Sequence, residues 1–499
     1  MAERNEKTIP PRRLAVQTLI RILDEGELSH HAEEQALEGS PGLNDRDRAF
    51  FHRIVKTVLE NLYRIDHVID SHASTPARKM KSLIRGELRV AVCQILFFDQ
   101  IPDSAAVNEA VADVKRSKLR SLAGFVNAVL RAVVRDPERD KLPEEEDSAE
   151  YLSVRYSMPV WIAEHFLKLY GAKDTAKIFA YFNSEHGISV HVNTGHPCRT
   201  DEEKEEKIRL VRESLEAEGV TVRPGSEPEC LQLFRVAGAE GSAGISAAGI
   251  ARTDAFRTGQ ITVQDESSYL AVKAACEELL REDLQEGLVS KQYAEPGCSP
   301  RYVVYDVCAA PGGKSLTAAE LLGPDAEIHA FDLSERKCAL IRENIARSGY
   351  GNVSAAVRDA RSKALAKGTL ADPEHGALPA ESCDLLICDL PCSGLGIMGR
   401  KKDIRYRLKQ SDLEDLAALQ RHILTAAVDL LKPGGVMMYS TCTIDPLENE
   451  EQAGWIEERF GLIPCGSRQF LPGADDCDGF YYALFRRPAY HSLKGDGSI

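Results

Sequence analysis

Apolar residues recur at three- and four-residue spacing through the first 136 positions of the chain. In FFHRIVKTVLENLYRIDHVID (50–70) this spacing gives a helix with one apolar face. The segments SLIRGELRVAVCQILFF (82–98) and GFVNAVLRAVVRD (124–136) repeat the pattern, and no strand-like alternation interrupts it. We therefore predict an all-helical domain over residues 1–140.

The pattern changes after a polar segment at 136–150, which contains two prolines and a run of acidic residues and is typical of a linker. GISVHVNT (187–194) predicts a strand, KIRLVRESLEAEG (207–219) an amphipathic helix, and VTVRP and LQLFRV two further short strands. Residues 141–255 are therefore predicted to form a linker and a small α+β module.

Apolar strand-like runs alternate with helical segments from about residue 260 onward, and this alternation is typical of a parallel sheet. We predict an α/β domain with a mostly parallel, Rossmann-like sheet over residues 256–499. Two Gly/Pro-rich stretches, 285–301 and 362–382, are predicted surface loops. The predicted strands are YVVYDVC (302–308), EIHAFDL (327–333), VSAAVRD (353–359), CDLLICDL (383–390) and GVMMYSTC (435–442).

Composition places the chain among soluble multidomain proteins. Its 499 residues suggest about three domains. It has no run of 18 apolar residues, and its polar N-terminus lacks the apolar stretch of a signal peptide, so we expect a cytoplasmic protein without a membrane segment. In that compartment the 13 cysteines are expected to be thiols.

The net charge of −15 argues mildly against a nucleic-acid partner. The charge is unevenly distributed, however: residues 1–140 hold 22 Lys+Arg against 21 Asp+Glu, whereas the remainder holds 40 against 56. A basic groove can coexist with an acidic outer surface, so net charge does not decide the partner.

A glycine turn follows the first predicted strand of the last domain, in AAPGGKS (309–315). Gly312 and Gly313 allow a ligand to approach the backbone, and the helix that follows offers N–H groups to an anion. An ordinary strand–helix turn is the alternative. The spacing is not the G-x-G-x-x-G of dinucleotide binders, which counts against a nicotinamide-dependent dehydrogenase.

Acidic residues close the next strands, and this favours a ligand site over a simple turn. Asp332, Asp359 and Asp389 end the second, third and fourth strands, and ligands of open parallel sheets bind at that edge. Each could instead cap a helix. A cofactor with a carboxylate and a ribose but no phosphate fits this arrangement, so we expect S-adenosylmethionine.

Two cysteines, Cys392 and Cys442, lie at the ends of strands that we expect to be adjacent. A thiolate beside this methyl donor suits the methylation of carbon 5 of cytosine, and a cation such as Lys314 could favour the thiolate. The alternative is that each cysteine is a small buried hydrophobe, as we expect for Cys308, Cys383 and Cys388. We expect no metal site, because Cys383, Cys388 and Cys392 lack paired C-x-x-C geometry.

Several motifs carry a family resemblance. DVCAAPGGK, FDLSERK, VRDAR, DLPCSGLGIMGRKKDIRYR and YSTCTIDPLENEEQ resemble, in sequence and order, the RNA cytosine-5 methyltransferases of the NOL1/NOP2/Sun type, which have a class I methyltransferase fold. RRLAVQTLIRIL, NEAV and GFVNAVLRAV resemble a NusB-type RNA-binding domain. The fusion of the two is similar to bacterial small-subunit rRNA methyltransferases.

The resemblance implies residue roles that spacing alone does not give. It implies Cys442 as the nucleophile, Cys392 as the thiol that assists product release, and a role for Asp389 with Pro391 in placing the cytosine. It implies 16S rRNA as the partner, which we expect to be bound by a monomer before the subunit is fully assembled; a tRNA cytosine-5 methyltransferase and a non-catalytic RNA-binding assembly factor are the alternatives. The implied cofactor contacts are Cys308, Ala309, Ala310, Pro311, Gly312, Gly313, Lys314, Asp332, Asp359 and Asp389.

Two positions depart from the resemblance: His191 stands where the family commonly has arginine, and Lys402 where it commonly has proline. The first departure predicts a weaker RNA contact and the second a less rigid RNA-facing loop. Candidate phosphate contacts are Arg12, Arg13, Arg46, Arg48, Lys79, Lys81, Arg400, Lys401 and Lys402.

Overall fold

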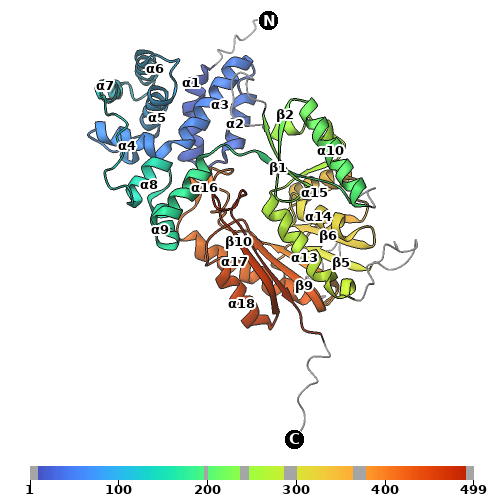
Figure 1. Ribbon diagram of the computed structural model, residues 1–499. Helices are drawn as coiled ribbons and strands as arrows, with labels where there is room; N and C mark the ends of the chain where they lie inside the picture. The colour runs from blue at the N-terminus through green and yellow to red at the C-terminus, as the bar shows by residue number, and fades with distance from the viewer. Residues whose placement is uncertain (1–8, 196–199, 236–246, 286–300, 363–377, 490–499) are drawn as a thin grey trace. The chain divides into compact units, whose positions relative to one another are not determined.

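The computed structural model describes residues 9–195, 200–235, 247–285, 301–362 and 378–489 (Figure 1). Its contacts divide the chain into two units: Met1–Ser184 with Met398–Gln410, and Glu185–Ile397 with Ser411–Ile499. The predicted domain boundaries at 140 and 255 stay predictions. Most of the two predicted surface loops, 286–300 and 363–377, lies outside the described residues. Within the described ranges, no helix combines the length and apolar content that crossing a membrane requires.

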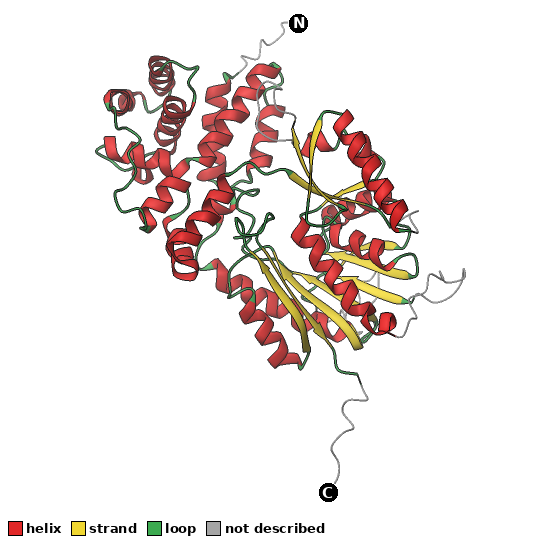
Figure 2. Cartoon of the chain, viewed as in Figure 1, coloured by secondary structure: helices red, strands yellow, loops and turns green. Residues whose placement is uncertain are grey.

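The first unit is helical throughout, as the apolar spacing predicted (red in Figure 2). Two short turns of 3₁₀-helix, η1 (Ala77–Lys79) and η2 (Arg120–Leu122), interrupt the α-helices. The α-helices are α1 (Pro11–Leu23), α2 (Ser29–Glu38), α3 (Asp45–Glu60), α4 (Leu62–His72), α5 (Ser82–Phe97), α6 (Asp103–Arg116), α7 (Ala123–Arg135), α8 (Ala149–Tyr156), α9 (Val160–Asn183) and the short α16 (Ile404–Arg407).

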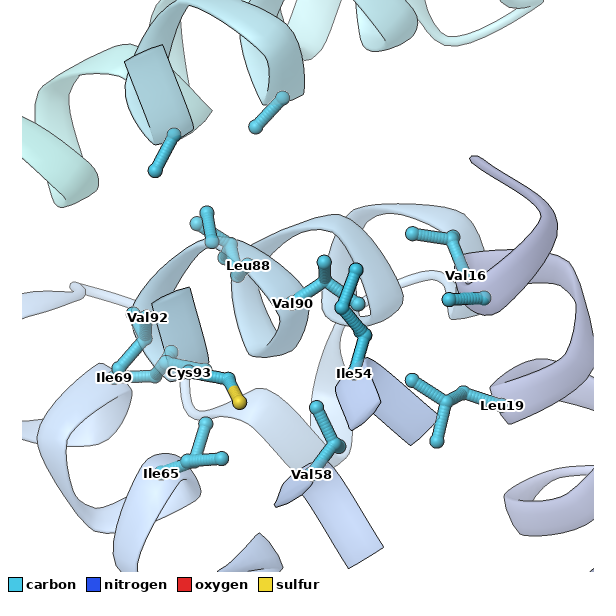
Figure 3. Close-up of a cluster of buried hydrophobic side chains, with 14 of the residues drawn as sticks. Val16, Leu19, Ile54, Val58, Ile65, Ile69, Leu88, Val90, Val92 and Cys93 are labelled. Carbon is cyan, nitrogen blue, oxygen red and sulfur yellow. The ribbon is translucent and has the colours of Figure 1, made fainter. Parts of the chain in front are cut away.

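The core of this unit is built around α5, whose buried side chains pack against α1, α3 and α4 (Figure 3). Val16 of α1, Ile54 of α3 and Ile65 of α4 are all fully buried there. Burying apolar side chains on this scale is what holds a helical bundle together, because isolated helices are marginal in water.

A segment from the last third of the sequence, residues 398–410, belongs to this helical unit. Asp403 Oδ2 accepts a hydrogen bond of 2.9 Å from the Ser29 backbone N–H, at the first turn of α2. Lys402 forms an ion pair with Glu60 of α3. Lys402 is therefore paired within this unit, and its role as an RNA contact stays a prediction.

The second unit contains a small antiparallel sheet, in the order β2-β3-β1-β4. Helix α10 begins about six residues earlier than predicted, because Thr200 and Glu203 form a capping box at its start. The elements of this part are β1 (Ile188–Val192), α10 (Asp201–Ala217), β2 (Val220–Pro224), β3 (Cys230–Arg235), α11 (Ala247–Ile250), α12 (Asp254–Arg257), β4 (Ile261–Val263) and α13 (Glu266–Gln285).

His191 lies on β1 and is only 1% exposed. Its Nε2 lies 3.1 Å from Oε2 of Glu320, which is also buried. Glu320 Oε1 accepts hydrogen bonds from the backbone N–H and the hydroxyl of Thr194. The sequence predicted a weaker RNA contact at His191; the structure instead places this side chain in a buried polar cluster, where it is not exposed to RNA.

The remaining strands of the second unit form a seven-stranded sheet in the order β10-β11-β9-β8-β5-β6-β7, counted over the described residues. The five predicted strands are present and parallel to one another. An antiparallel pair, β10 and β11, extends the sheet and was not predicted. The bounds are β5 (Tyr302–Asp306), α14 (Gly313–Leu322), β6 (Ala326–Asp332), α15 (Glu335–Ser348), β7 (Val353–Val357), β8 (Cys383–Asp389), α17 (Asp412–Ala427), η4 (Val428–Leu430), β9 (Leu431–Thr441), α18 (Glu450–Phe460), β10 (Ile463–Phe470) and β11 (Phe480–Arg486).

Candidate active site

Four neighbouring parallel strands bring the predicted site residues to one edge of the sheet. Asp332, Asp306, Asp389 and Thr441 are the last residues of β6, β5, β8 and β9, which lie side by side in that order. Because the strands are parallel, their carboxyl ends share this edge, where open α/β sheets bind ligands.

The glycine turn connects β5 to α14, as predicted. Gly312 has φ +105°, a conformation that side chains disfavour, and a Cβ there would lie 3.1 Å from Ile341 Cγ2. Helix α14 begins at the next residue, Gly313. The turn therefore presents a helix N-terminus without side chains to keep an anionic ligand group away.

Asp332 is tied directly to this turn. Its Oδ2 accepts a hydrogen bond of 3.1 Å from the Ala310 N–H, and its Oδ1 accepts one of 2.7 Å from the Leu333 N–H. Lys337 Nζ lies 3.0 Å from Oδ1. A carboxylate has about four acceptor positions, so Oδ2 keeps capacity for a ligand hydroxyl. These donors and acceptors fit a cofactor that carries a carboxylate and a ribose.

Asp306 is fully buried and receives a 2.7 Å hydrogen bond from the Ser315 hydroxyl. Its other oxygen, Oδ1, is buried and has no hydrogen-bond partner among the described residues. Burial raises the pKa of Asp306 to about 7. No signal in the sequence marks this buried carboxyl group, whose raised pKa favours the neutral acid below about pH 7.

Asp389 receives two contacts that fix its carboxylate. Lys314 Nζ lies 2.7 Å from Oδ2, and the Ser440 hydroxyl donates to Oδ1 at 2.9 Å. Lys314, which was predicted to favour a thiolate, pairs with Asp389 and also interacts electrostatically with Cys442; both interactions raise its pKa. The third predicted acid, Asp359, lies two residues beyond the end of β7, where its hydrogen bonds with Arg361 lower its pKa.

Cys392 and Cys442 are brought together as predicted: their Sγ atoms are 3.3 Å apart. Backbone hydrogen bonds join the two loops, from Leu390 N to Ser440 O at 3.1 Å and from Gly396 N to the Cys442 carbonyl at 3.2 Å. The hydrogen bond with Cys442 and the burial of its sulfur raise the pKa of Cys392 well above the ordinary thiol value.

Two other cysteines of this sheet are part of the apolar core. Cys383 and Cys388 of β8 are fully buried among apolar side chains. Burial raises the pKa of each thiol, so both behave as small hydrophobes, as expected.

Arg12 does not face solvent, although it was a candidate for binding phosphate. Its side chain is buried, with Nη1 2.7 Å from Glu87 and 3.6 Å from Asp113. By contrast, Arg13, Arg46, Lys79, Lys81, Arg400 and Lys401 are exposed, and Arg48 is half-buried.

Sequence analysis missed several polar residues that organise this edge. They are Ser315, Ser440, Gln420 and Glu448, which hold Asp306, Asp389 and the loop of Cys392. Ser440 and Glu448 lie in the motif YSTCTIDPLENEEQ, and Ser315 ends AAPGGKS, but neither motif indicates their hydrogen-bond partners. No local signal marks Gln420, whose partner Pro391 is 29 positions away.

The parallel sheet, the glycine turn and the paired cysteines together define a class of enzyme, the S-adenosylmethionine-dependent methyltransferases. Residues 298–486 match the family model described as 16S rRNA methyltransferase RsmB/F, and residues 9–135 match the NusB family.

Whole-chain relatives agree with these matches. A probable ribosomal RNA small subunit methyltransferase B of Bacillus subtilis is 30% identical, over 95% of this chain and 98% of the relative. One of Synechocystis is 29% identical, over 96% and 100%. The crystal structure of PH0851 superposes with a TM-score of 0.69 at 25% identity, covering 96% of this chain and 99% of that one. The chain belongs to the 16S rRNA methyltransferase RsmB/F family.

Proposed function

We propose that this protein methylates carbon 5 of a cytosine in 16S rRNA, with Cys442 as the nucleophile and Cys392 as the thiol that assists release. The observation that carries the proposal is the 3.3 Å contact between the two sulfur atoms, at the ends of adjacent strands beside the glycine turn. The names of the whole-chain relatives support small-subunit rRNA as the substrate, and the NusB-family match supports an RNA-binding role for residues 9–135.

The chemistry requires a covalent bond between enzyme and base. Carbon 5 of cytosine is a poor nucleophile, and it becomes reactive when the Cys442 thiolate adds to carbon 6. S-adenosylmethionine, when bound, supplies an electrophilic methyl group. A base then removes the proton on carbon 5, the electron pair restores the carbon 5–carbon 6 double bond, and the bond from carbon 6 to sulfur breaks. Cys442 leaves as a thiolate.

The environment of Cys392 supports these roles. The raised pKa of Cys392 favours its thiol form, which can donate its S–H to Cys442 and so stabilise a thiolate there. Cys392 is then in place beside the adduct to assist the elimination. Asp389, fixed by Lys314 and Ser440, and the exposed Pro391 would place the cytosine ring.

The cofactor would lie against the residues of the glycine turn and the strand ends. Cys308 to Lys314 would line one side, and the carboxylate of Asp332 would accept the ribose hydroxyls. Asp359 and Asp389 would provide further cofactor contacts. The predictions of a cytoplasmic monomer that acts before the subunit is assembled stay predictions.

A pair of variants tests the roles of the cysteines. Cys442→Ala should abolish transfer of labelled methyl groups to unmodified 16S rRNA and should form no covalent RNA adduct. Cys392→Ala should form the adduct but release it slowly, so that a band of reduced mobility accumulates in a denaturing gel. Cys465→Ala, a half-buried cysteine of β10, is the matched control and should behave like wild type.

The opposite pattern, with the band in Cys442→Ala and not in Cys392→Ala, would reverse the two roles. Transfer to unmodified tRNA but not to 16S rRNA would identify the alternative substrate. Absence of transfer to any RNA by the wild-type protein would favour the non-catalytic assembly factor.

A further inference from the structure

The two peptide groups that flank Cys392 are each held by a buried side chain. Gln420 Nε2, from α17, donates to the Pro391 carbonyl at 3.0 Å. On the other side, the Ser393 N–H donates to Glu448 Oε2 at 3.0 Å. Gln420 Nε2 also donates to the same Glu448 oxygen at 2.9 Å, so the two side chains form one clamp around Cys392.

Glu448 connects this clamp to the loop that carries Cys442. It lies six residues beyond Cys442, and its backbone carbonyl accepts a hydrogen bond from the Tyr439 hydroxyl on β9. A second link joins the same two loops, between the hydroxyls of Ser393 and Thr443 at 2.8 Å. The position of Cys392 relative to Cys442 therefore depends in part on contacts that meet at Glu448, and these contacts hold both peptide groups next to Cys392.

The environment of Glu448 is costly for a carboxyl group. The residue is fully buried, and its second oxygen, Oε1, has no hydrogen-bond partner in the part of the chain that the structure describes. Burial raises its pKa. An apolar residue would avoid this cost but would leave the Ser393 N–H without its acceptor.

We infer that Glu448 is a positioning residue, which holds Cys392 beside Cys442 so that the second thiol can assist release of the methylated base. The inference rests on the proposed roles of the two cysteines. It assigns to Glu448 no contact with RNA or cofactor. Its effect passes through the peptide group of Ser393.

Disulfide trapping tests the geometry without RNA. Diamide takes one hydrogen from each of two thiols and is reduced to its hydrazine, while the sulfurs close to about 2.05 Å. Wild-type protein should form the Cys392–Cys442 disulfide readily, as measured by mass spectrometry of the joined peptides. Glu448→Ala should form it about tenfold more slowly, a factor at the upper end of that expected for loss of one ordinary hydrogen bond.

Two further variants separate positioning from folding. Glu448→Gln keeps an oxygen that can accept a hydrogen bond from Ser393, so it should form the disulfide at close to the wild-type rate. If Glu448→Gln forms the disulfide as slowly as Glu448→Ala, the negative charge of Glu448 is required, and that result would contradict the inference. Gln420→Ala removes the other half of the clamp and should also slow trapping; it replaces Glu448→Ala if that variant does not fold. Glu451→Gln, an exposed glutamate in the first turn of α18, is the matched control and should match wild type.

The RNA reaction gives the second readout. Glu448→Ala should accumulate the covalent adduct as Cys392→Ala does, with kcat reduced about tenfold and KM for RNA within about twofold of wild type. Two results would overturn this inference and leave the proposed function intact. One is disulfide formation by Glu448→Ala at the wild-type rate. The other is a covalent adduct that is present in Cys392→Ala but absent from Glu448→Ala. Absence of the adduct from Cys392→Ala itself would instead overturn the proposed role of that cysteine, and the trapping rates would still decide whether Glu448 positions it.

Discussion

At the scale of single residues, the acids at the strand ends differ in how their charge is balanced. Asp389 pairs with Lys314, Asp332 with Lys337, and Asp359 with Arg361. Asp306 instead receives a hydrogen bond from the neutral hydroxyl of Ser315 and is fully buried. A buried carboxyl without a nearby ion-pair partner is more stable as the neutral acid. The edge therefore combines three acids that are paired with basic side chains and one, Asp306, whose pKa burial raises to about 7.

Asp306 should make the stability of the second unit depend on pH. Its pKa is about 7 in the folded protein and about 3.9 when unfolded, so the folded state binds more protons between these values. The free energy of unfolding should therefore fall as pH rises from about 4 to 7, by at most about 4 kcal/mol. Asp306→Asn keeps an acceptor for Ser315 and lacks this contribution. The free energy of unfolding of this variant, measured with urea, should exceed that of wild type by an amount that grows between pH 4.5 and 8. A difference that stays constant with pH would contradict the raised pKa of Asp306.

At the scale of elements, a distant segment completes the start of helix α2. The N-cap position of α2 is Leu28, which has no side-chain oxygen to accept a hydrogen bond. Asp403, in the segment 398–410, supplies that oxygen and accepts a hydrogen bond from the Ser29 N–H. A carboxylate at a helix N-terminus also interacts favourably with the helix dipole. Docking of the segment and order in α2 are therefore coupled.

Asp403→Ala should loosen the first turn of α2. Loss of an N-terminal cap costs about 1 to 2 kcal/mol, so amide hydrogen exchange of the turn beginning at Ser29 should become roughly 5- to 30-fold faster. Asp403→Asn keeps the acceptor and should have a smaller effect. Asp415→Ala, an exposed aspartate of α17, is the control and should leave α2 unchanged. Unaltered exchange in Asp403→Ala would show that the contact does not hold the helix.

Strand positions were predictable to within a few residues because buried parallel strands are continuous apolar runs. Cys392 and Cys442 could also be paired in advance, since the strands they follow are adjacent in such a sheet. The 398–410 segment was not predictable in this way: its charged sequence indicates exposure, and only tertiary contacts commit Lys402 and Asp403 to the helical unit. Glu448 was missed for the same reason, because its partner Ser393 is 55 positions away.

At the scale of the whole molecule, charge alone cannot select an RNA substrate. The chain carries −15, and its first 140 residues are nearly balanced. Of the basic residues of the first unit, Arg12 is neutralised by buried acids, whereas Arg13, Arg46 and Lys79 are exposed. RNA binding must therefore depend on local contacts and on the shape of the RNA more than on net charge.

The state of the substrate should then decide the rate of methylation. In the proposed reaction, a cytosine must leave its stack to reach the sulfur pair, which is only partly exposed, at a cost of a few kcal/mol. Bound ribosomal proteins add to that cost by fixing the RNA fold. We expect labelled methyl groups to be incorporated into protein-free, unmodified 16S rRNA at least about tenfold faster than into assembled small subunits, since about 1.4 kcal/mol of added cost suffices for that factor. Equal or faster incorporation into assembled subunits, at matched RNA concentration, would place the enzyme after assembly and would show that the folded subunit presents the base.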